Sequence, residues 1–197
     1  MQQSWRQDHD KLTFIICLPL PESARQLSNI RAGEFDGPEQ MIGDVNLFLS
    51  EFESDDDEGS KGNEEIFRGL VGELEIMIPS PSHQRKGYAR TALQIFIHYI
   101  LTHWRKLAAE YAGGTDEGTA KHVRKLEYLR VKIGETNVAS VKLFEGLEFE
   151  QHGAVSYFKE VELRWKPDVQ QLQAGKGYET ARDMTYDDEC SEADGSG

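Results

Sequence analysis

Hydrophobic residues follow two different spacings along the chain, and each spacing predicts a different kind of element. Alternating or continuous apolar runs predict strands, over 11–18, 41–49, 70–78, 126–133 and 154–164. Apolar residues that recur every three or four positions predict two helices, over 87–110 and 137–147. This order predicts a mixed α/β domain, in which strands 70–78 and 126–133 run parallel because a helical crossover joins them.

The loop between strand 70–78 and the first helix has the chemistry of an anion site. Gly87 lets the backbone approach a ligand closely, and the helix that begins there presents unpaired N–H groups and the positive end of its dipole. Arg85, Lys86 and Arg90 add positive charge. The loop therefore predicts a phosphate or pyrophosphate site. It is not a Walker loop, and it lacks the three-glycine dinucleotide fingerprint.

Two segments resemble a known family. The pattern Gln-x-x-Gly-x-Ala at 84–89 resembles the acyl-CoA pyrophosphate loop of the GCN5-related N-acetyltransferases (GNAT). The stretch 137–149 resembles the later helix of that family, and Asn137 is a suitable N-cap for it. Within the superfamily the chain looks closest to the N-acetyltransferase 9-like branch, relatives of the ribosomal-protein alanine acetyltransferases.

The resemblance implies the acyl-CoA N-acyltransferase fold, with a mixed central sheet whose strands before and after the first helix splay apart. The pantetheine arm of acetyl-CoA would enter this splay, and backbone N–H groups near Met77 would polarise the thioester carbonyl. The cofactor-binding residues that the resemblance implies are Met77, Ile78, Gln84, Arg85, Lys86, Gly87, Tyr88, Ala89, Arg90, Asn137 and Ser140.

Catalytic candidates lie on the strand before the loop. Glu73 and Glu75 share one face of that strand, because side chains alternate, and a glutamate in this region acts as general base in members of the family. Glu73 is preferred over Glu75, and the alternative is that both are solvated charges. Many relatives have a tyrosine where this chain has Phe144, so the general acid is either another group, such as Tyr157, or solvent.

Charge and composition set the domain boundaries. Most of the net charge of −13 falls in 50–65 and 166–197. We expect an acetyltransferase domain over 4–165, with an acidic loop insertion at 51–64, a flexible insertion at 111–124 and a disordered acidic tail at 166–197. The domain resembles a family member shortened at its N-terminus, without the first strand and helices that close the acceptor side.

Several classes of function are disfavoured by composition. The chain has no stripe of basic residues that would predict nucleic-acid binding, and no apolar run that would predict a membrane span. Cys17 and Cys190 lack metal-site spacing, so neither a metal nor a disulfide framework is expected, and a cytoplasmic location fits, as does a nuclear one.

Three functions stay open at this point. The first is an acyltransferase that moves acetyl from acetyl-CoA to an amine, with a protein or peptide as acceptor. The second is a catalytically inactive scaffold or regulatory protein that keeps the GNAT fold. The third, weaker, is a protein that binds another nucleotide phosphate.

Overall fold

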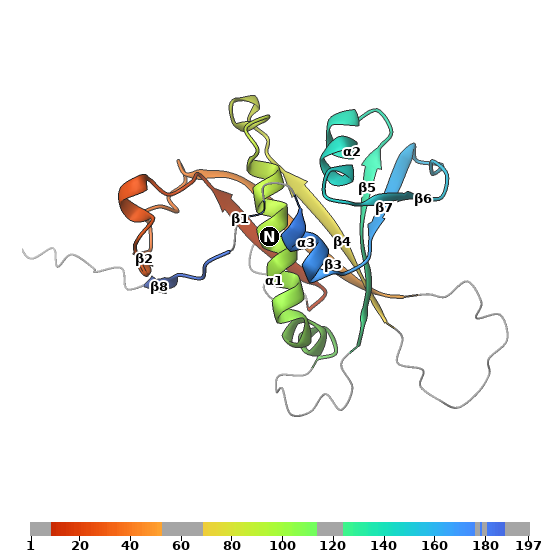
Figure 1. The fold of residues 1–197 in the computed structure, drawn as a ribbon, viewed down its shortest axis with the longest axis horizontal. Helices are drawn as coiled ribbons and strands as arrows, with labels where there is room; N and C mark the ends of the chain where they lie inside the picture. The colour runs from red at the N-terminus through yellow and green to blue at the C-terminus, as the bar shows by residue number, and fades with distance from the viewer. Residues whose placement is uncertain (1–8, 53–68, 114–123, 176–177, 179–180, 188–197) are drawn as a thin grey trace, which may run out of the picture.

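The computed structural model describes residues 9–52, 69–113, 124–175, 178 and 181–187. Its centre is a six-stranded sheet with the strand order β1-β3-β4-β5-β7-β6 (Figure 1). Neighbouring strands are antiparallel except β4 and β5, which are parallel. The sheet consists of β1 (Lys11–Cys17), β3 (Met41–Glu51), β4 (Leu70–Met77), β5 (Leu126–Gly134), β6 (Glu150–His152) and β7 (Glu160–Trp165).

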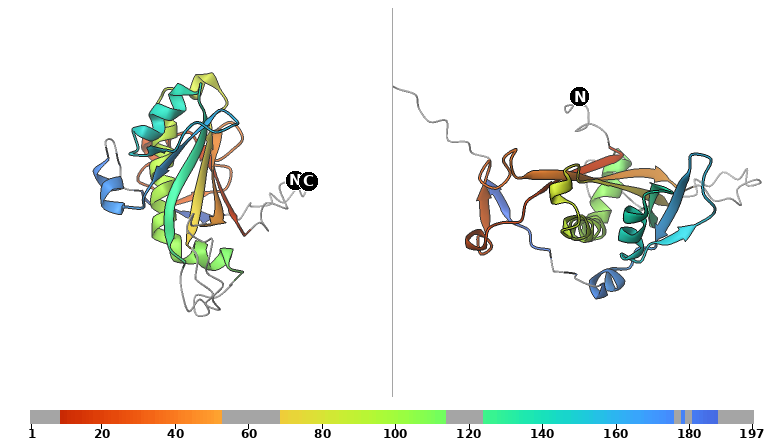
Figure 2. Two further views of the ribbon diagram at one scale, coloured as in Figure 1. Left: turned by 90° about the vertical axis from the view of Figure 1, so that its right-hand side faces the viewer. Right: turned by 90° about the horizontal axis from the view of Figure 1, so that it is seen from above.

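Three α-helices cover one face of this sheet (Figure 2). They are α1 (Tyr88–Tyr111), α2 (Val138–Glu145) and α3 (Val169–Ala174). The core lies between these helices and the inward-facing residues of the strands, and its fully buried members include Leu47, Leu74, Phe96, Leu129 and Leu163. Because strand side chains alternate, burying these residues turns their neighbours to the opposite face.

The opposite face of the sheet is polar, and within the described residues no α-helix covers it (Figure 2). Its side chains form rows across the strands. One row runs Phe48, Glu73, Arg130, Arg164 and Glu150, as the strand registers show. Glu73 faces Arg130 and Glu150 faces Arg164, while Arg130 and Arg164 face each other as like charges, and such a charged row suits a surface in contact with water.

The strands β4 and β5 form a parallel pair over only part of their length. Their register runs from Leu70 opposite Leu126 to Glu73 opposite Arg130. Although 74–77 and 131–134 are both described, no pair joins them, while β4 remains paired with β3 up to Met77. The two strands therefore diverge into a wedge that begins after Glu73, as the family resemblance implies.

The long connection from β1 to β3 forms a small unit with the C-terminal segment. It contains the 3₁₀ helix η1 (Glu22–Ala24) and β2 (Asn29–Arg31), which pairs in parallel with β8 (Thr185–Asp187) at one end of the molecule (Figure 1). The chain reaches β8 from β7 by way of α3, whose Leu172 is buried. The C-terminal segment thus crosses the helical face and returns to the N-terminal half.

Most of the predicted elements are present. The mixed α/β class, both predicted helices and the parallel crossover are confirmed. Two predictions need correction. The final strand is shorter than 154–164, because Lys159 adopts a φ of 64° in the turn before β7. The tail predicted to be disordered from 166 contains α3 and β8 in its described part.

Parts of the remaining predictions fall outside the described residues. They are 53–64 of the acidic loop, 114–123 of the second insertion, and the tail at 176–177, 179–180 and 188–197, which includes Cys190.

Candidate active site

The loop after β4 is held by a side chain that the sequence assigns to the cofactor. Gln84 donates a hydrogen bond from Nε2 to the Ile78 carbonyl at 2.8 Å, which ties the loop back to the end of the strand. Between them lies a 3₁₀ turn, η2 (Pro81–His83). This bond fixes the direction from which the chain enters α1.

Gly87 is the N-cap of α1 and has a φ of 89°. A Cβ built at this position would meet no atom within 4 Å, so the backbone conformation, rather than local crowding, favours glycine here. The first amide groups of α1 have no acceptor within the helix and project with the positive end of its dipole toward the loop. The sequence predicts an anion site at this position.

Arg85 also lies in the left-handed region, with a φ of 61°. A non-glycine residue in this conformation costs on the order of 1 kcal/mol, and such strain concentrates at ligand sites. Two left-handed residues within three positions turn the loop sharply beneath the start of α1.

A cavity of about 480 Å³ opens beside this loop. Its walls come from the end of β4, the loop, the first turn of α1 and the first turns of α2. Most of the predicted cofactor residues line it, namely Ile78, Gln84, Arg85, Gly87, Tyr88, Ala89, Arg90, Asn137 and Ser140. Lys86 is exposed and does not line it, whereas the sequence did not single out His83 and Lys142, which do.

A second cavity of about 400 Å³ occupies the wedge between β4 and β5. It shares Ile76, Asn137 and Ser140 with the first cavity, so the two cavities adjoin and together form a channel beside the loop and the wedge. Met77 lines the wedge and Phe144 closes its inner end with a side chain that is 2% exposed.

Asn137 begins α2 in the way the sequence predicts. Its Oδ1 accepts a hydrogen bond from the Ser140 backbone N–H at 3.2 Å, the usual contact of an N-cap. Both residues also line the channel. The same contact that starts the helix therefore places its first turn against the wedge.

The two candidate bases have different surroundings. Glu73 accepts a hydrogen bond from Arg130 Nε at 2.8 Å and forms an ion pair with Lys132 Nζ at 3.1 Å, and it is not among the residues that line the wedge. Glu75 lines the wedge and is exposed. The geometry therefore favours Glu75 as the carboxylate that reaches a ligand, the reverse of the preference stated from sequence.

The aromatic candidates are also separated. Phe144 lies in the wedge, in edge-to-face contact with Phe149 at 5.2 Å between ring centroids. Tyr157 stands on the turn before β7 with 93% of its surface exposed, and it lines neither cavity.

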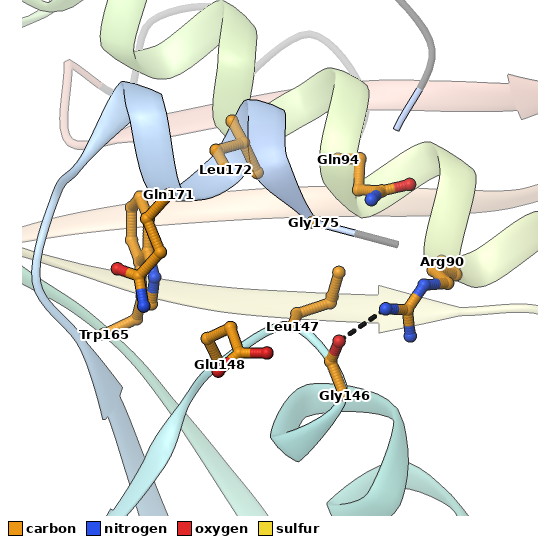
Figure 3. Close-up of a pocket in the computed structure, with 9 residues that line it drawn as sticks. All are labelled: Arg90, Gln94, Gly146, Leu147, Glu148, Trp165, Gln171, Leu172 and Gly175. Atoms are coloured by element: carbon orange, nitrogen blue, oxygen red, sulfur yellow. Dashed lines mark hydrogen bonds between the residues drawn. The ribbon is translucent and has the colours of Figure 1, made fainter. Parts of the chain in front are cut away.

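Arg90 points toward α2 rather than only toward the loop. Its Nη2 donates a hydrogen bond to the Gly146 carbonyl at the C-terminal end of α2, as Figure 3 shows. A Cβ on Gly146 would lie 2.8 Å from the Arg90 guanidinium, so this contact is close. The side chain joins the helix that starts at the loop to the helix that walls the channel.

Comparison with known proteins agrees with this architecture. The family model described as acetyltransferase (GNAT) domain matches residues 2–150. This chain belongs to the GNAT acetyltransferase family. As a GNAT protein it is 38% identical to an N-acetyltransferase 9-like protein of Schizosaccharomyces pombe, over 83% of this chain and 73% of that protein.

Two further matches broaden the comparison. The chain is 32% identical to the human alpha/beta-tubulin-N-acetyltransferase 9, over 83% of this chain and 59% of that protein, so it spans less than two thirds of that relative. Among solved structures it resembles Arabidopsis thaliana NAA60 in complex with acetyl-CoA, with 8% identity, a TM-score of 0.45, and coverage of 80% of this chain and 76% of that one.

The described residues contain neither a group of three or more His, Cys, Asp or Glu side chains suited to a metal ion nor a helix long and apolar enough to cross a membrane.

Proposed function

We propose that this protein is an acyltransferase that moves the acetyl group of acetyl-CoA to an amine of a protein acceptor. The observation that supports the proposal is the pair of adjoining cavities, one beside the left-handed loop at the start of α1 and one in the wedge between β4 and β5. An anion site joined to an exposed strand edge suits a ligand with a pyrophosphate at one end and amides along its arm.

The loop would hold the pyrophosphate. Backbone N–H groups of Gly87, Tyr88 and Ala89 would donate to its oxygens, with the helix dipole and the Arg85 side chain adding positive potential. Lys142, on the opposite wall, would add a further positive charge. Gln84 would act indirectly, because its amide already binds the Ile78 carbonyl.

The wedge would hold the arm and the thioester. Backbone groups of 74–77 on the side facing β5 have no strand partner there, so they are available to an extended ligand that carries amide groups. Acetyl-CoA supplies the acetyl thioester. An N–H near Met77 would stabilise negative charge on its carbonyl oxygen, and Asn137 and Ser140 would contact the arm.

Glu75 would serve as the general base. The amine nitrogen bonds to the acetyl carbon, the carbon–sulfur bond breaks, and Glu75 receives the amine proton directly or through one water. The departing thiolate would take its proton from solvent, because Phe144 has none to give and Tyr157 lies on an exposed turn. Base catalysis of this kind contributes about 10²- to 10⁴-fold to the rate.

The acceptor amine would belong to a protein, and tubulin is the candidate that the name of the human relative suggests. The open, polar face of the sheet beside Glu75 supports a large acceptor, since the described helices all lie on the other face (Figure 2).

Calorimetric titration with acetyl-CoA tests the proposal, using Gly87→Glu and Gly113→Glu as a matched pair. Both glycines have positive φ values, 89° and 75°, and neither has an atom within 4 Å of a built Cβ. They lie at opposite ends of α1, so both variants carry similar backbone strain, but only the first puts a carboxylate in the anion site. We expect Gly87→Glu alone to lose binding; equal binding by both would refute the cofactor site.

The buried Phe144 favours one second candidate, a GNAT-fold regulatory protein without turnover. Acetyl-CoA binding without acetylation of tubulin, or of a peptide panel with free amines, would support it. Transfer that depends on Glu75 would exclude it.

A further inference from the structure

A lysine of this chain lies where the wedge opens. The last parallel pair of β4 and β5 is Glu73 opposite Arg130. Two positions farther along each strand, on the same face of the sheet, are Glu75 on β4 and Lys132 on β5, and both line the wedge cavity. The two residues therefore flank the opening, with a carboxylate on one wall and a primary amine on the other.

The Lys132 side chain is held only partly. Its Nζ forms an ion pair with Glu73 Oε2 at 3.1 Å, and 39% of the side chain is exposed. The register also places Glu162 of β7 opposite Lys132, but the Glu162 carboxylate accepts a hydrogen bond from Arg164. The ammonium group therefore stays within reach of the cavity, at the end of a flexible four-carbon stem.

The carboxylate next to Lys132 has a second cationic partner. Glu73 Oε2 accepts a hydrogen bond from Arg130 Nε at 2.8 Å. If Lys132 lost its charge, Glu73 would still be paired with Arg130, whose side chain is 24% exposed. Neutralising Lys132 would thus change the charge of the wedge by one unit without leaving a carboxylate unpaired.

We propose that Lys132 is a site of self-acetylation, in which the protein transfers acetyl from its own bound acetyl-CoA to the Lys132 Nζ. This inference rests on the proposed function, because the same wedge would hold the thioester. It concerns a modification of the protein and is independent of which outside amine the protein acetylates.

The reaction needs no component besides acetyl-CoA. The Lys132 ammonium gives one proton to Glu73, and the neutral amine attacks the acetyl carbon. A nitrogen–carbon bond forms, the carbon–sulfur bond breaks, and CoA leaves as the thiolate. Of the two protons that Nζ loses, one ends on the CoA sulfur and the other in solvent. The products are a neutral acetamide on Lys132 and free CoA.

Proximity should make the modification selective. A bound thioester and an amine in the same cavity react without a diffusional encounter, which raises the rate over that of a free lysine. Lys142 lines the cavity beside the loop but not the wedge, and the exposed Lys166 lines neither. These two lysines therefore measure the background reaction with acetyl-CoA.

The test is mass spectrometry of the full chain incubated with acetyl-CoA at mildly alkaline pH. Peptide mapping follows acetylation at Lys132, Lys142 and Lys166 over time. We expect Lys132 to react at least about tenfold faster than the other two, with a first-order rate constant that does not change when the protein is diluted.

Two variants locate the source of the acetyl group. Lys132→Arg keeps the charge but removes the amine, so the fast gain of one acetyl group in the intact mass should disappear, whereas Lys142→Arg should retain it. Gly87→Glu, which places a carboxylate at the start of α1, should slow Lys132 to the rate of Lys166. Unfolding curves show whether each variant is folded.

The outcomes separate the inference from the proposed function. Equal rates at Lys132 and Lys166, a rate constant that rises with protein concentration, or fast labelling that persists in Gly87→Glu would overturn the inference, even if a peptide amine is acetylated. Fast labelling of Lys132 that Gly87→Glu abolishes, without transfer to any peptide amine, would support the inference and count against a protein acceptor.

Discussion

Glu73 and Arg130 face each other as the last parallel pair of β4 and β5, joined by a hydrogen bond of 2.8 Å, at the point where the strands diverge. Lys132, two residues farther along β5, reaches the same carboxylate at 3.1 Å. These contacts anchor the closed end of the wedge. They also engage Glu73, whereas Glu75 lines the cavity.

Replacing the two glutamates should therefore affect different properties, mainly kcat for Glu75 and mainly the free energy of unfolding for Glu73. Glu75→Gln should lower kcat by about 10²-fold or more while acetyl-CoA affinity and stability stay unchanged. Glu73→Gln should lower the free energy of unfolding by about 1 kcal/mol, since its partners are only partly buried, with a smaller effect on kcat. Steady-state kinetics and urea unfolding of both variants check this. A large kcat loss confined to Glu73→Gln would reverse the assignment.

Gly43→Ala should damage the open end of the wedge. A Cβ at this position would lie 2.1 Å from the Met77 carbonyl oxygen, which belongs to the backbone and cannot rotate away. We expect a loss of about 2 kcal/mol in the free energy of unfolding, together with weaker acetyl-CoA binding. In Gly134→Ala the added Cβ meets nothing within 4 Å, and its stability should match the wild type. Similar unfolding curves for both variants would contradict the prediction.

Replacing Arg90 tests whether the link between α1 and α2 matters for stability. Arg90→Met keeps the apolar stem but loses the hydrogen bond to the Gly146 carbonyl. We expect the free energy of unfolding to fall by about 1 kcal/mol, whereas Lys86→Met should leave it unchanged. If Arg90 affects acetyl-CoA binding by positioning α2, the loss of affinity in Arg90→Met should be similar at low and high salt. Salt screens direct charge contacts, so a direct contact would give a loss that depends on salt. A loss that vanishes at high salt would indicate direct contact with the pyrophosphate.

The docking of α3 on the core predicts that a substitution in the C-terminal tail lowers the free energy of unfolding. Leu172 is 6% exposed and packs into the core, whereas Val169 on the same helix is 43% exposed. Leu172→Ala should therefore lower the free energy of unfolding by about 2 kcal/mol, and Val169→Ala by less than about 0.5 kcal/mol. Denaturant titrations compare the two. Equal effects would mean that α3 does not stay docked in solution.

The link between β2 and β8 should weaken in acid. Tyr186 donates a hydrogen bond to Asp36 at 2.6 Å, and this bond holds the pKa of Asp36 below its ordinary value. A lowered pKa in the folded state means that the ionised carboxylate favours folding. This contribution is complete above the ordinary pKa of about 4 and disappears as the pH falls through the lowered value.

NMR titration of the Asp36 carboxyl carbon measures this directly. In Tyr186→Phe the pKa of Asp36 should rise toward its ordinary value, while in Tyr178→Phe, whose hydroxyl contacts His98, it should stay low. An unchanged pKa in Tyr186→Phe would show that the hydrogen bond does not form in solution.

The sequence predicts the local features well and the long-range contacts poorly. Periodicity locates α1 and β4, and Gly87 marks the start of α1, because these signals lie within a few neighbouring residues. The partners of Glu73 and Arg90 come from 57 and 56 residues away, so their engagement depends on strand register and helix packing. The acidic composition of 166–197 led to a prediction of disorder and so did not predict α3. This short helix docks through one buried leucine, Leu172.

Asp44 and Asn46 line the wedge cavity, but the sequence did not single them out, for a related reason. In the sequence they are ordinary polar positions in an alternating strand, and only the register with β1 and β4 brings Thr13 and Glu75 beside them. No spacing rule within β3 carries that information.

The short parallel pairing of β4 with β5 divides the sheet into two three-stranded halves, β1-β3-β4 and β5-β7-β6, hinged at Leu70–Glu73. Each half is held together by antiparallel pairing, so we expect it to move as one body. We expect a ligand that changes the width of the opening to rotate one half against the other about Leu70–Glu73. Local opening of the sheet should therefore be concentrated at 74–77 and 131–134, and the amide protons of Leu70–Glu73 should exchange last.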